Sequence, residues 1–203
     1  MIEELCEQLL KELEIAGSPL LSYFQPGISR RTVDDILEKN DIELDLPDEV
    51  YSLYQWRNGL NEDKVRSKAM GEVGLFTLAV FNSLSNSIKT YQDPDVQKYS
   101  PSKGLFPLFE SSGGDFYFID TDKKSDTYKM IIFYSFANPY ILHGASIFDS
   151  LDTCLVTVVE CYRKKAYYYI QGLPDLEINP KLEMSIWEKN NPNSEYYKIM
   201  RNS

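Results

Sequence analysis

The sequence has little sulfur and almost no imidazole. Its 203 residues include three cysteines and a single histidine, His143. No Cys-x-x-Cys pair or Cys/His cluster is present, so too few soft ligands exist for a structural zinc site. Cys154 and Cys161 fall in one predicted helix, where a rise of about 1.5 Å per residue places their Cα atoms about 10 Å apart, beyond disulfide reach. We therefore expect reduced, buried cysteines and no bound metal.

Basic residues are also in short supply. Lysine and arginine number 21 against 31 acidic residues, which gives a formal net charge of −10 at pH 7. Nucleic acids and anionic membranes attract basic surfaces, so this balance argues against direct contact with either. A basic protein partner remains open, because a negative field speeds encounter with it. Solubility alone is the competing explanation of the charge.

Long apolar runs are missing as well. No window approaches the roughly 18 uninterrupted apolar residues of a membrane-spanning helix. The first segment, MIEELCEQLLKELEIAG, has acids where a secretory signal has basic residues and then an apolar run. These features predict a cytoplasmic protein. Aromatic residues are plentiful, with 15 tyrosines and 10 phenylalanines, and they can supply the core of one ordinary domain.

Helical periodicity and capping residues mark both ends of the chain. Apolar residues recur at steps of three and four in 1–16, and Ser29 can cap a second helix that ends at Asn40. In LPDEVYSLYQWRNGL, proline at the first helical position, two following acids and a terminal glycine predict a third helix over 47–59. Two more helices are predicted, over 148–169 and 179–192.

The middle of the chain favours strands. From Gly71 onward, short runs of aromatic and β-branched residues alternate with Gly, Ser, Asn and Asp, which is typical of antiparallel strands. A short helix over LSNSIKTYQDPDV and the turns SSGGD and TDKKSD separate these runs. The predicted strands are Leu75–Val80, Leu105–Phe109, Phe116–Asp120 and Met130–Tyr134. We find no repeat or long linker, so the pattern predicts one α+β domain.

Two loops superficially resemble ligand-binding motifs. Gly113–Asp115 could suggest a phosphate cradle, but a strand follows it, whereas phosphate loops lead into a helix. The segment from Asp120 could suggest a calcium loop, yet Lys124 and Ser125 occupy its fifth and sixth positions and Ile131 its twelfth. These features favour a hairpin turn and a solvated acidic turn, and no cofactor is expected.

Acid–base catalysis is a third hypothesis for the central segment. Glu110, Asp115 and Asp120 could converge beside a cleft, but the sequence does not supply the separation that paired carboxylates need. His143 could act as a general base in a pocket, while a surface or hydrogen-bonded core position is the simpler interpretation. No Gly-x-Ser-x-Gly, Cys/His or kinase signature is present. The sequence therefore predicts no enzyme.

The order of several motifs resembles that of the SUKH superfamily. PGISRRTVDDILEKNDIELDLPDEVYSLYQWRNGL is similar to its entrance motif, a glycine-initiated helix followed by a Leu-Pro-acid-acid helix ending in Trp-x-Asn-Gly. GLFPLFESSGGDFYFIDTD is similar to its central hairpin, although Gly104 and Leu105 stand where a tryptophan is common. The helix from Phe148 and the closing IWEKNNPNSEYY extend the resemblance over about Tyr23 to Tyr197.

This resemblance implies a fold and a binding role. The expected fold is a single SUKH-like domain over 1–203, with a core of about 23–197 and the helix 1–16 packed on it or flanking it. A central, mostly antiparallel sheet would be flanked by N-terminal and C-terminal helices. Bacterial members are typically immunity proteins that bind a secreted toxin, often a nuclease, and block it. Fungal relatives suggest the alternative of a non-enzymatic regulatory scaffold for a host protein.

The candidate partner-binding residues are those beside the central hairpin and one tryptophan. Glu110, Asp115, Asp120 and Asp122 would form an acidic surface for a basic toxin domain. Trp56 either packs against the sheet, which is the favoured interpretation, or joins the binding surface, where tryptophan is enriched. We expect no catalytic residue and no small-molecule substrate.

Overall fold

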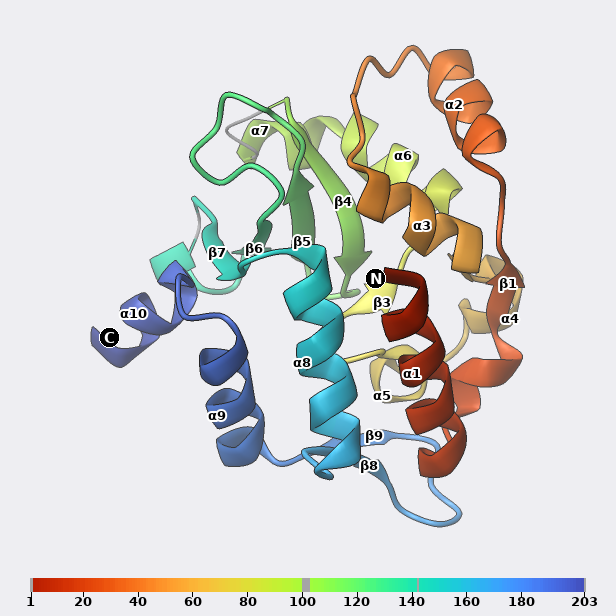
Figure 1. Cartoon of the computed structure of the whole chain (residues 1–203), viewed down its shortest axis with the longest axis vertical. Coiled ribbons are helices and arrows are strands. Elements are labelled where there is room, and N and C mark those ends of the chain that lie inside the picture. Colours follow the sequence, from red (N-terminus) through yellow and green to blue (C-terminus); the bar gives the residue numbers. More distant parts are fainter. Residues whose placement is uncertain (1, 100–102, 142, 203) are drawn as a thin grey trace.

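An antiparallel sheet forms the centre of the protein. The computed structural model describes residues 2–99, 103–141 and 143–202. Within these residues the main sheet has the strand order β3-β4-β5-β6-β7, and every pairing is antiparallel (Figure 1). The predicted α+β class with a central antiparallel sheet is confirmed. The strands are β3 (Val80–Phe81), β4 (Leu105–Glu110), β5 (Asp115–Asp120), β6 (Ile131–Ser135) and β7 (Ala145–Phe148).

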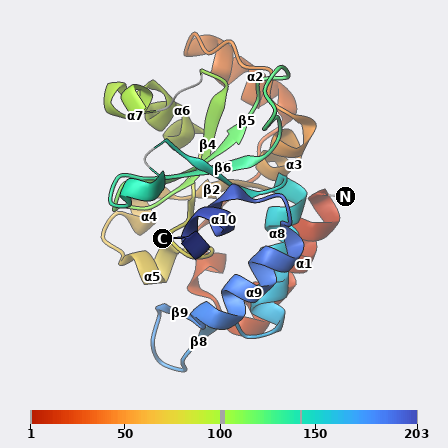
Figure 2. The same cartoon turned by 90° about the vertical axis from the view of Figure 1, so that its left-hand side faces the viewer.

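Helices and two small sheets surround this centre. The small sheets pair β1 (Phe24–Pro26) with β2 (Arg57–Leu60), and β8 (Tyr167–Tyr169) with β9 (Leu176–Ile178). Before the main sheet come α1 (Ile2–Ala16), η1 (Pro19–Ser22), α2 (Arg30–Lys39), α3 (Asp48–Trp56), α4 (Glu62–Val65) and α5 (Met70–Val73). Further along are α6 (Leu84–Gln92), α7 (Pro94–Tyr99), η2 (Pro139–Ile141), α8 (Leu151–Arg163), α9 (Pro180–Asn190) and α10 (Glu195–Asn202). Figures 1 and 2 show α9 beside α8, and α10 packs near β7.

Helices α1 and α8 pack side by side because each has an apolar face. Every third or fourth residue of α1 is buried, as the periodicity predicts, namely Ile2, Cys6, Leu9 and Leu13. Helix α8 begins with a reciprocal cap: Ser150 Oγ accepts from the N–H of Thr153 at 3.1 Å, and Thr153 Oγ1 accepts from the N–H of Ser150 at 2.9 Å. This cap fixes the residue at which α8 begins after β7.

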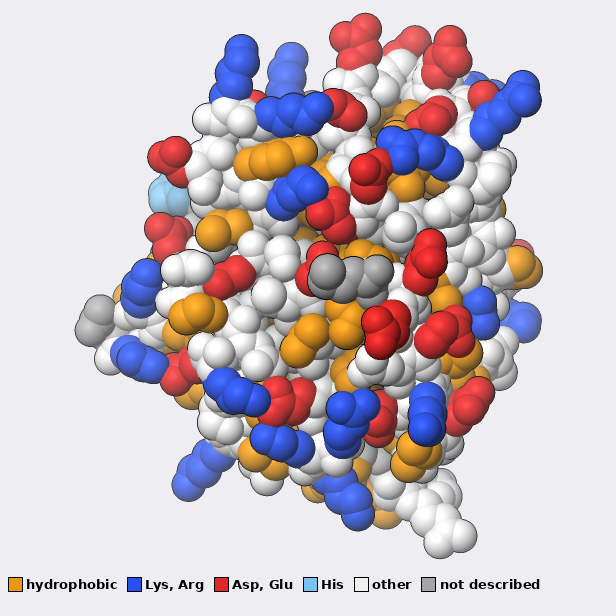
Figure 3. All heavy atoms as spheres, in the orientation of Figure 1, with side chains coloured by type: hydrophobic (Ala, Val, Ile, Leu, Met, Phe, Trp, Pro, Cys, Tyr) orange, Lys and Arg blue, Asp and Glu red, His pale blue; other side chains and the backbone are white. Residues whose placement is uncertain are grey.

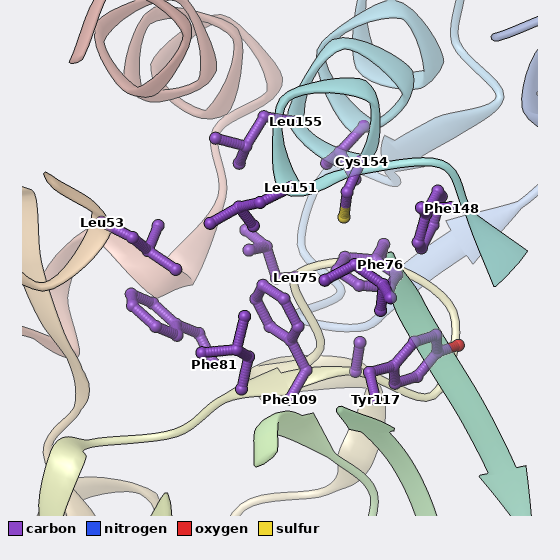
Figure 4. Packing of buried hydrophobic residues seen from close by; sticks show 14 of the residues in the cluster. Leu53, Leu75, Phe76, Phe81, Phe109, Tyr117, Phe148, Leu151, Cys154 and Leu155 are labelled. Carbon is purple, nitrogen blue, oxygen red and sulfur yellow. The ribbon is translucent and has the colours of Figure 1, made fainter. Parts of the chain in front are cut away.

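Aromatic rings fill the space between these helices and the sheet. Phe76 is 1% exposed and meets Phe109 of β4 and Tyr117 of β5 edge-on, with ring centroids 5.1 and 5.2 Å away. Leu53 of α3 and Leu151 of α8 close the cluster from the helical side (Figure 4). Side chains from the first helix to the last strand therefore share one core.

The other face of the sheet carries a smaller apolar cluster. Phe118, Ile132 and Tyr134 pack there with Val96 of α7. Successive residues of a strand point to opposite faces, so Tyr117 enters the main core while Phe118 enters this cluster. Burial on both faces explains why β5 and β6 read as nearly continuous apolar runs.

The third helix is shorter than the sequence predicts. It ends at Trp56, and Arg57 is already extended, with φ −149° and ψ 140°. Residues Arg57–Leu60 form β2, which pairs with β1. Pairing with a distant strand thus replaces the last helical turn that a terminal Gly59 suggested. Pro47 is the residue just before the helix, not its first helical residue.

The predicted strand Leu75–Val80 is wrong over most of its length. Only Val80 belongs to β3, and the residues before it form a tight turn closed by the bridge between Phe76 and Ala79. Leu78 has a left-handed backbone, with φ +54°. Leu75, Phe76 and Ala79 are buried and enter the core from this turn, whereas Leu78 is 42% exposed.

The predicted helix over 148–169 also ends early. Helix α8 stops at Arg163, and Lys165 adopts a left-handed conformation with φ +58°. The tyrosine run after it forms β8, which pairs with β9. Aromatic residues favour strands, and a partner strand in the following segment completes the pairing.

The three cysteines are buried and free, as predicted. Burial, the largest influence on each, raises the pKa of the Cys6 thiol to about 12 and that of Cys161 to about 12. Burial raises the pKa of Cys154 as well. Since the thiolate is the reactive form, these side chains act as apolar filler at neutral pH.

Glu160 joins the end of α8 to α9. Its carboxylate accepts hydrogen bonds from Lys164 Nζ at 2.7 Å, from Asn190 Nδ2 at 2.9 Å and from Lys189 Nζ at 2.9 Å. These donors, Lys164 foremost, lower the pKa of Glu160 from 4.5 to about 2. The folded chain therefore favours the ionised form of Glu160. The resulting stability is present above pH 4.5 and is lost as the pH falls toward 2.

Replacing Glu160 with glutamine should lower the free energy of unfolding at pH 7 by about 1–2 kcal/mol, because its lysine partners are solvent-exposed and their attraction is screened. Urea unfolding at pH 7 and at about pH 3 measures this. The difference from the unsubstituted protein should shrink at the lower pH. Glu7→Gln, on the exposed face of α1, is the control and should change stability by less than about 0.5 kcal/mol. An equal loss at both pH values would contradict the proposed linkage.

Candidate functional site

The hairpin of β4 and β5 carries the four predicted partner-binding carboxylates. Its turn is held by Ser111, whose hydroxyl donates to Oδ2 of Asp115 at 2.6 Å and accepts from the N–H of Gly113 at 3.1 Å. The N–H of Ser111 also donates to the carbonyl of Asp115 at 2.8 Å. SSGGD is therefore a hairpin turn, as predicted, and its carboxylate is part of the turn's own hydrogen bonding.

The four carboxylates lie at two ends of this hairpin. Glu110 and Asp115 flank the turn, and we call this region the turn end. Asp120 and Asp122 lie where β5 passes into the loop before β6, and we call this region the open end. Asp115 and Asp120 begin and end one strand, so they are about 17 Å apart at about 3.4 Å per residue. Paired glycosidase carboxylates lie about 5–10 Å apart, which excludes this pair from that role.

The two carboxylates at the turn end occupy opposite faces of the sheet. Glu110 pairs directly with Phe116, whereas Asp115 pairs with Ser135. Because neighbouring residues of a strand alternate, Asp115 shares the face of Tyr117 and the main core. Glu110 is half-buried, and its Oε2 accepts from Thr90 Oγ1 of α6 at 2.7 Å.

At the open end, Asp120 organises its own loop. It is 2% exposed; Oδ1 accepts from the N–H of Asp122 at 2.9 Å and Oδ2 accepts from Thr127 Oγ1 at 2.7 Å. Asp122 is exposed, and its Oδ1 accepts from the N–H of Lys124 at 2.9 Å. Of the two open-end carboxylates, Asp122 is thus the accessible one.

A shallow groove of about 620 Å³ lies beside the open end. Lys123 forms an ion pair with Asp45 across it. Acids and bases are both present, so the negative charge of this groove is partly cancelled. Its charged lining residues are Asp41, Glu43, Asp45, Lys103, Asp122, Lys123 and Lys124.

The turn end borders a smaller pocket, of about 210 Å³. Asp115 lines it together with Glu183 of α9, and its lining contains no lysine or arginine. Glu183 carries no sequence motif that marks it as a site residue. No spacing rule connects it with Asp115, because the two are far apart in the chain and only the packing of α9 against the sheet brings them to one pocket.

Trp56 lies away from both ends of the hairpin, at the end of α3. Its ring packs against Phe24 of β1, with centroids 5.3 Å apart, and the residue is 8% exposed. The guanidinium of Arg57 lies 5.5 Å from the ring centroid. The indole N–H has no hydrogen-bond partner among the described atoms. Little of this ring is accessible to a partner.

Charges of both signs cover the face shown in Figure 3, where acidic and basic side chains are interspersed. In the described ranges, no three His, Cys, Asp or Glu side chains gather as a metal ion would require. No helix of the same residues is both long enough and apolar enough to cross a membrane. His143 is exposed in the segment before β7.

The fold and this site define an α+β protein built on an antiparallel meander, whose candidate functional residues are hairpin carboxylates. A sequence model of the SMI1 / KNR4 family (SUKH-1) matches residues 30–155, more than half of the 203-residue chain. The chain belongs to this family, which confirms the resemblance to the SUKH superfamily. The matched segment runs from α2 into α8 and includes the whole central sheet. No curated protein matches the chain.

Proposed function

We propose that this chain is an immunity-type protein that binds a basic protein, a cognate bacterial toxin, and neutralises it. Membership of the SMI1 / KNR4 family (SUKH-1) is the observation that carries the proposal, because the family resemblance implies a binding role. The net charge of −10 supports a basic partner, since opposite charge speeds encounter between proteins. A nuclease toxin fits well, because nucleases need basic clefts for phosphate.

The contact surface that we propose is centred on the turn end of the hairpin. Neither Glu110 nor Asp115 takes part in an ion pair within the described residues. Asp122 at the open end instead shares its groove with three lysines. Negative charge is therefore less compensated at the turn end. A contact of ordinary size would bury about 800 Å² on each partner, which extends well beyond the turn itself.

Replacing the exposed turn residue Ser112 with lysine should slow association with the purified partner about threefold to tenfold, because a base then stands between Glu110 and Asp115. Stopped-flow association rates at low and high salt measure this. The difference should shrink at high salt, since the screening length is about 10 Å at 0.1 M and about 3 Å at 1 M.

Ser67→Lys is the matched control, because Ser67 is exposed between α4 and α5 and the change in charge is the same. An equal slowing in this variant would assign the effect to net charge alone. Asp122→Asn, which raises the net charge by one as Ser112→Lys does, tests the open end. A larger effect there than for Ser112→Lys would move the contact surface to that end.

The partner itself can be obtained by affinity capture from the native organism followed by mass spectrometry. Capture of a toxin whose lethality is suppressed when this chain is co-expressed would support the immunity role. Capture of a host enzyme, with no protection against any toxin, would favour a regulatory scaffold instead. Substrate turnover by the purified chain that Asp115→Asn abolishes would contradict a binding role.

A further inference from the structure

The pocket at the turn end is small and lined by aromatic rings. It lies where α9 and α10 approach β5, β6 and β7, and Figure 2 shows these helices together on that side of the molecule. Ligand sites for drug-sized molecules span about 300–1,000 Å³, so a pocket of about 210 Å³ suits a single side chain better than a metabolite. The rings in its lining are Tyr117, Phe133, Trp187, Tyr196 and Tyr197.

Two carboxylates face this pocket without a basic partner. Neither Asp115 nor Glu183 joins an ion pair in the part of the chain that the structure describes. Burial, and then the negative charges of Glu183 and Asp115, raise the pKa of Tyr196. Both carboxylates also raise the pKa of the buried Tyr117, after burial itself. Two carboxylates therefore line the pocket, and its lining contains no lysine or arginine to compensate them.

Glu183 is held in place by a chain of hydrogen bonds. Trp187 Nε1 donates to the hydroxyl of Tyr167 at 3.1 Å, and that hydroxyl donates to Oε1 of Glu183 at 2.6 Å. The hydroxyl of Thr77 donates to the same oxygen. Burial raises the pKa of Glu183, so its charged form is disfavoured here in the absence of a cation.

Tyr197 carries an unpaired polar group next to this pocket. It is 6% exposed and lines the pocket, yet its hydroxyl has no hydrogen-bond partner among the described atoms. A buried polar group without a partner is unfavourable, so a shift of the Tyr197 ring that brings this shielded hydroxyl to a donor of the ligand would be favoured. A phenolic oxygen can accept a hydrogen bond from such a donor.

We propose that this pocket receives an arginine side chain of the bound protein. A guanidinium is planar, stacks on aromatic faces, and carries five N–H donors that suit carboxylate and phenol oxygens. It is also more weakly hydrated than a lysine ammonium, so a small aromatic pocket can desolvate it more easily. The proposal rests on the proposed function, because the arginine belongs to the partner, and the test below separates the two.

The test titrates the full chain with Nα-acetyl-arginine amide and, separately, with Nα-acetyl-citrulline amide, its neutral isostere. Tryptophan fluorescence reports binding, since Trp187 lines the pocket. We expect saturable millimolar binding of the arginine probe and none of the citrulline probe. Glu183→Gln should weaken binding of the arginine probe about tenfold, because a charge-assisted hydrogen bond is lost.

Glu188→Gln is the matched control on the same helix, where Glu188 pairs with Arg201 at 2.6 Å and does not line the pocket. It should leave probe binding unchanged. Thermal melting shows whether each variant is folded. Since the pKa of Glu183 is raised, glutamine at this position removes an unfavourable charge and should not lower stability at neutral pH.

Three results would overturn the proposal: equal binding of both probes, no effect of Glu183→Gln, or tighter binding of Nα-acetyl-lysine amide than of the arginine probe. If the captured partner still binds the chain while the arginine probe does not, the pocket assignment fails and the proposed function stands. If no partner binds the chain but the arginine probe does, the proposed function fails and the pocket assignment stands.

Discussion

Replacing Gly59 with alanine should lower the free energy of unfolding by more than about 3 kcal/mol. Gly59 has φ +65°, a left-handed conformation that costs a residue with a Cβ about 1–2 kcal/mol. A Cβ at this position would also overlap the backbone of Asn82 and Ser83, which no side-chain rotation can relieve. The side chain of neighbouring Asn58 accepts from the N–H of Leu84 at 2.9 Å, so the same segment holds the start of α6.

Gly17→Ala is the control that separates the two causes of this loss. Gly17 has nearly the same backbone, with φ +69°, but a Cβ there would meet nothing within 4 Å. Gly17→Ala should lower the free energy of unfolding by about 1–2 kcal/mol, from backbone strain alone. Urea unfolding of both variants provides the comparison. Equal losses would show that the close approach of β2 to the start of α6 contributes nothing.

Replacing Phe76 with alanine should lower the free energy of unfolding by about 3–5 kcal/mol. The ring is 1% exposed, and besides Phe109 and Tyr117 it meets Phe148 and Trp187 edge-on, with centroids 5.9 and 6.0 Å away. Its removal leaves a cavity among large rings that are attached to the sheet and to α9, so collapse around it is limited.

Phe136→Ala makes the same chemical change at a position that is 38% exposed. It should lower the free energy of unfolding much less than Phe76→Ala does. Urea unfolding followed by circular dichroism measures both variants. Because Trp187 borders both Phe76 and the turn-end pocket, Phe76→Ala should also weaken binding of the arginine probe. A loss below about 2 kcal/mol would mean that the core around Phe76 repacks freely.

Local rules predicted much of the fold correctly. The helix from Ile2 to Ala16 follows from apolar spacing, and Ser29 caps α2 by accepting from the N–H of Thr32 at 3.1 Å. The strands β4, β5 and β6 were predicted to within a residue at either end, because runs of aromatic and β-branched residues bounded by turn residues indicate strands directly.

The errors arose where a distant partner decided the local structure. Arg57–Leu60 became β2 because β1 lies beside it, and the tyrosine run became β8 because β9 does. The predicted strand before β3 became a turn that delivers Phe76 to the core. Periodicity and capping describe interactions within a few residues, so they do not detect such partners.

Composition and motifs of short span are enough to establish the family, the negative charge, the buried cysteines and the hairpin that carries the carboxylates. Three-dimensional packing is needed to learn that Asp115 and Asp120 are separated in space while Asp115 and Glu183 meet at one pocket. Strand alternation and the length of β5 separate the first pair, whereas packing of α9 against the sheet unites the second.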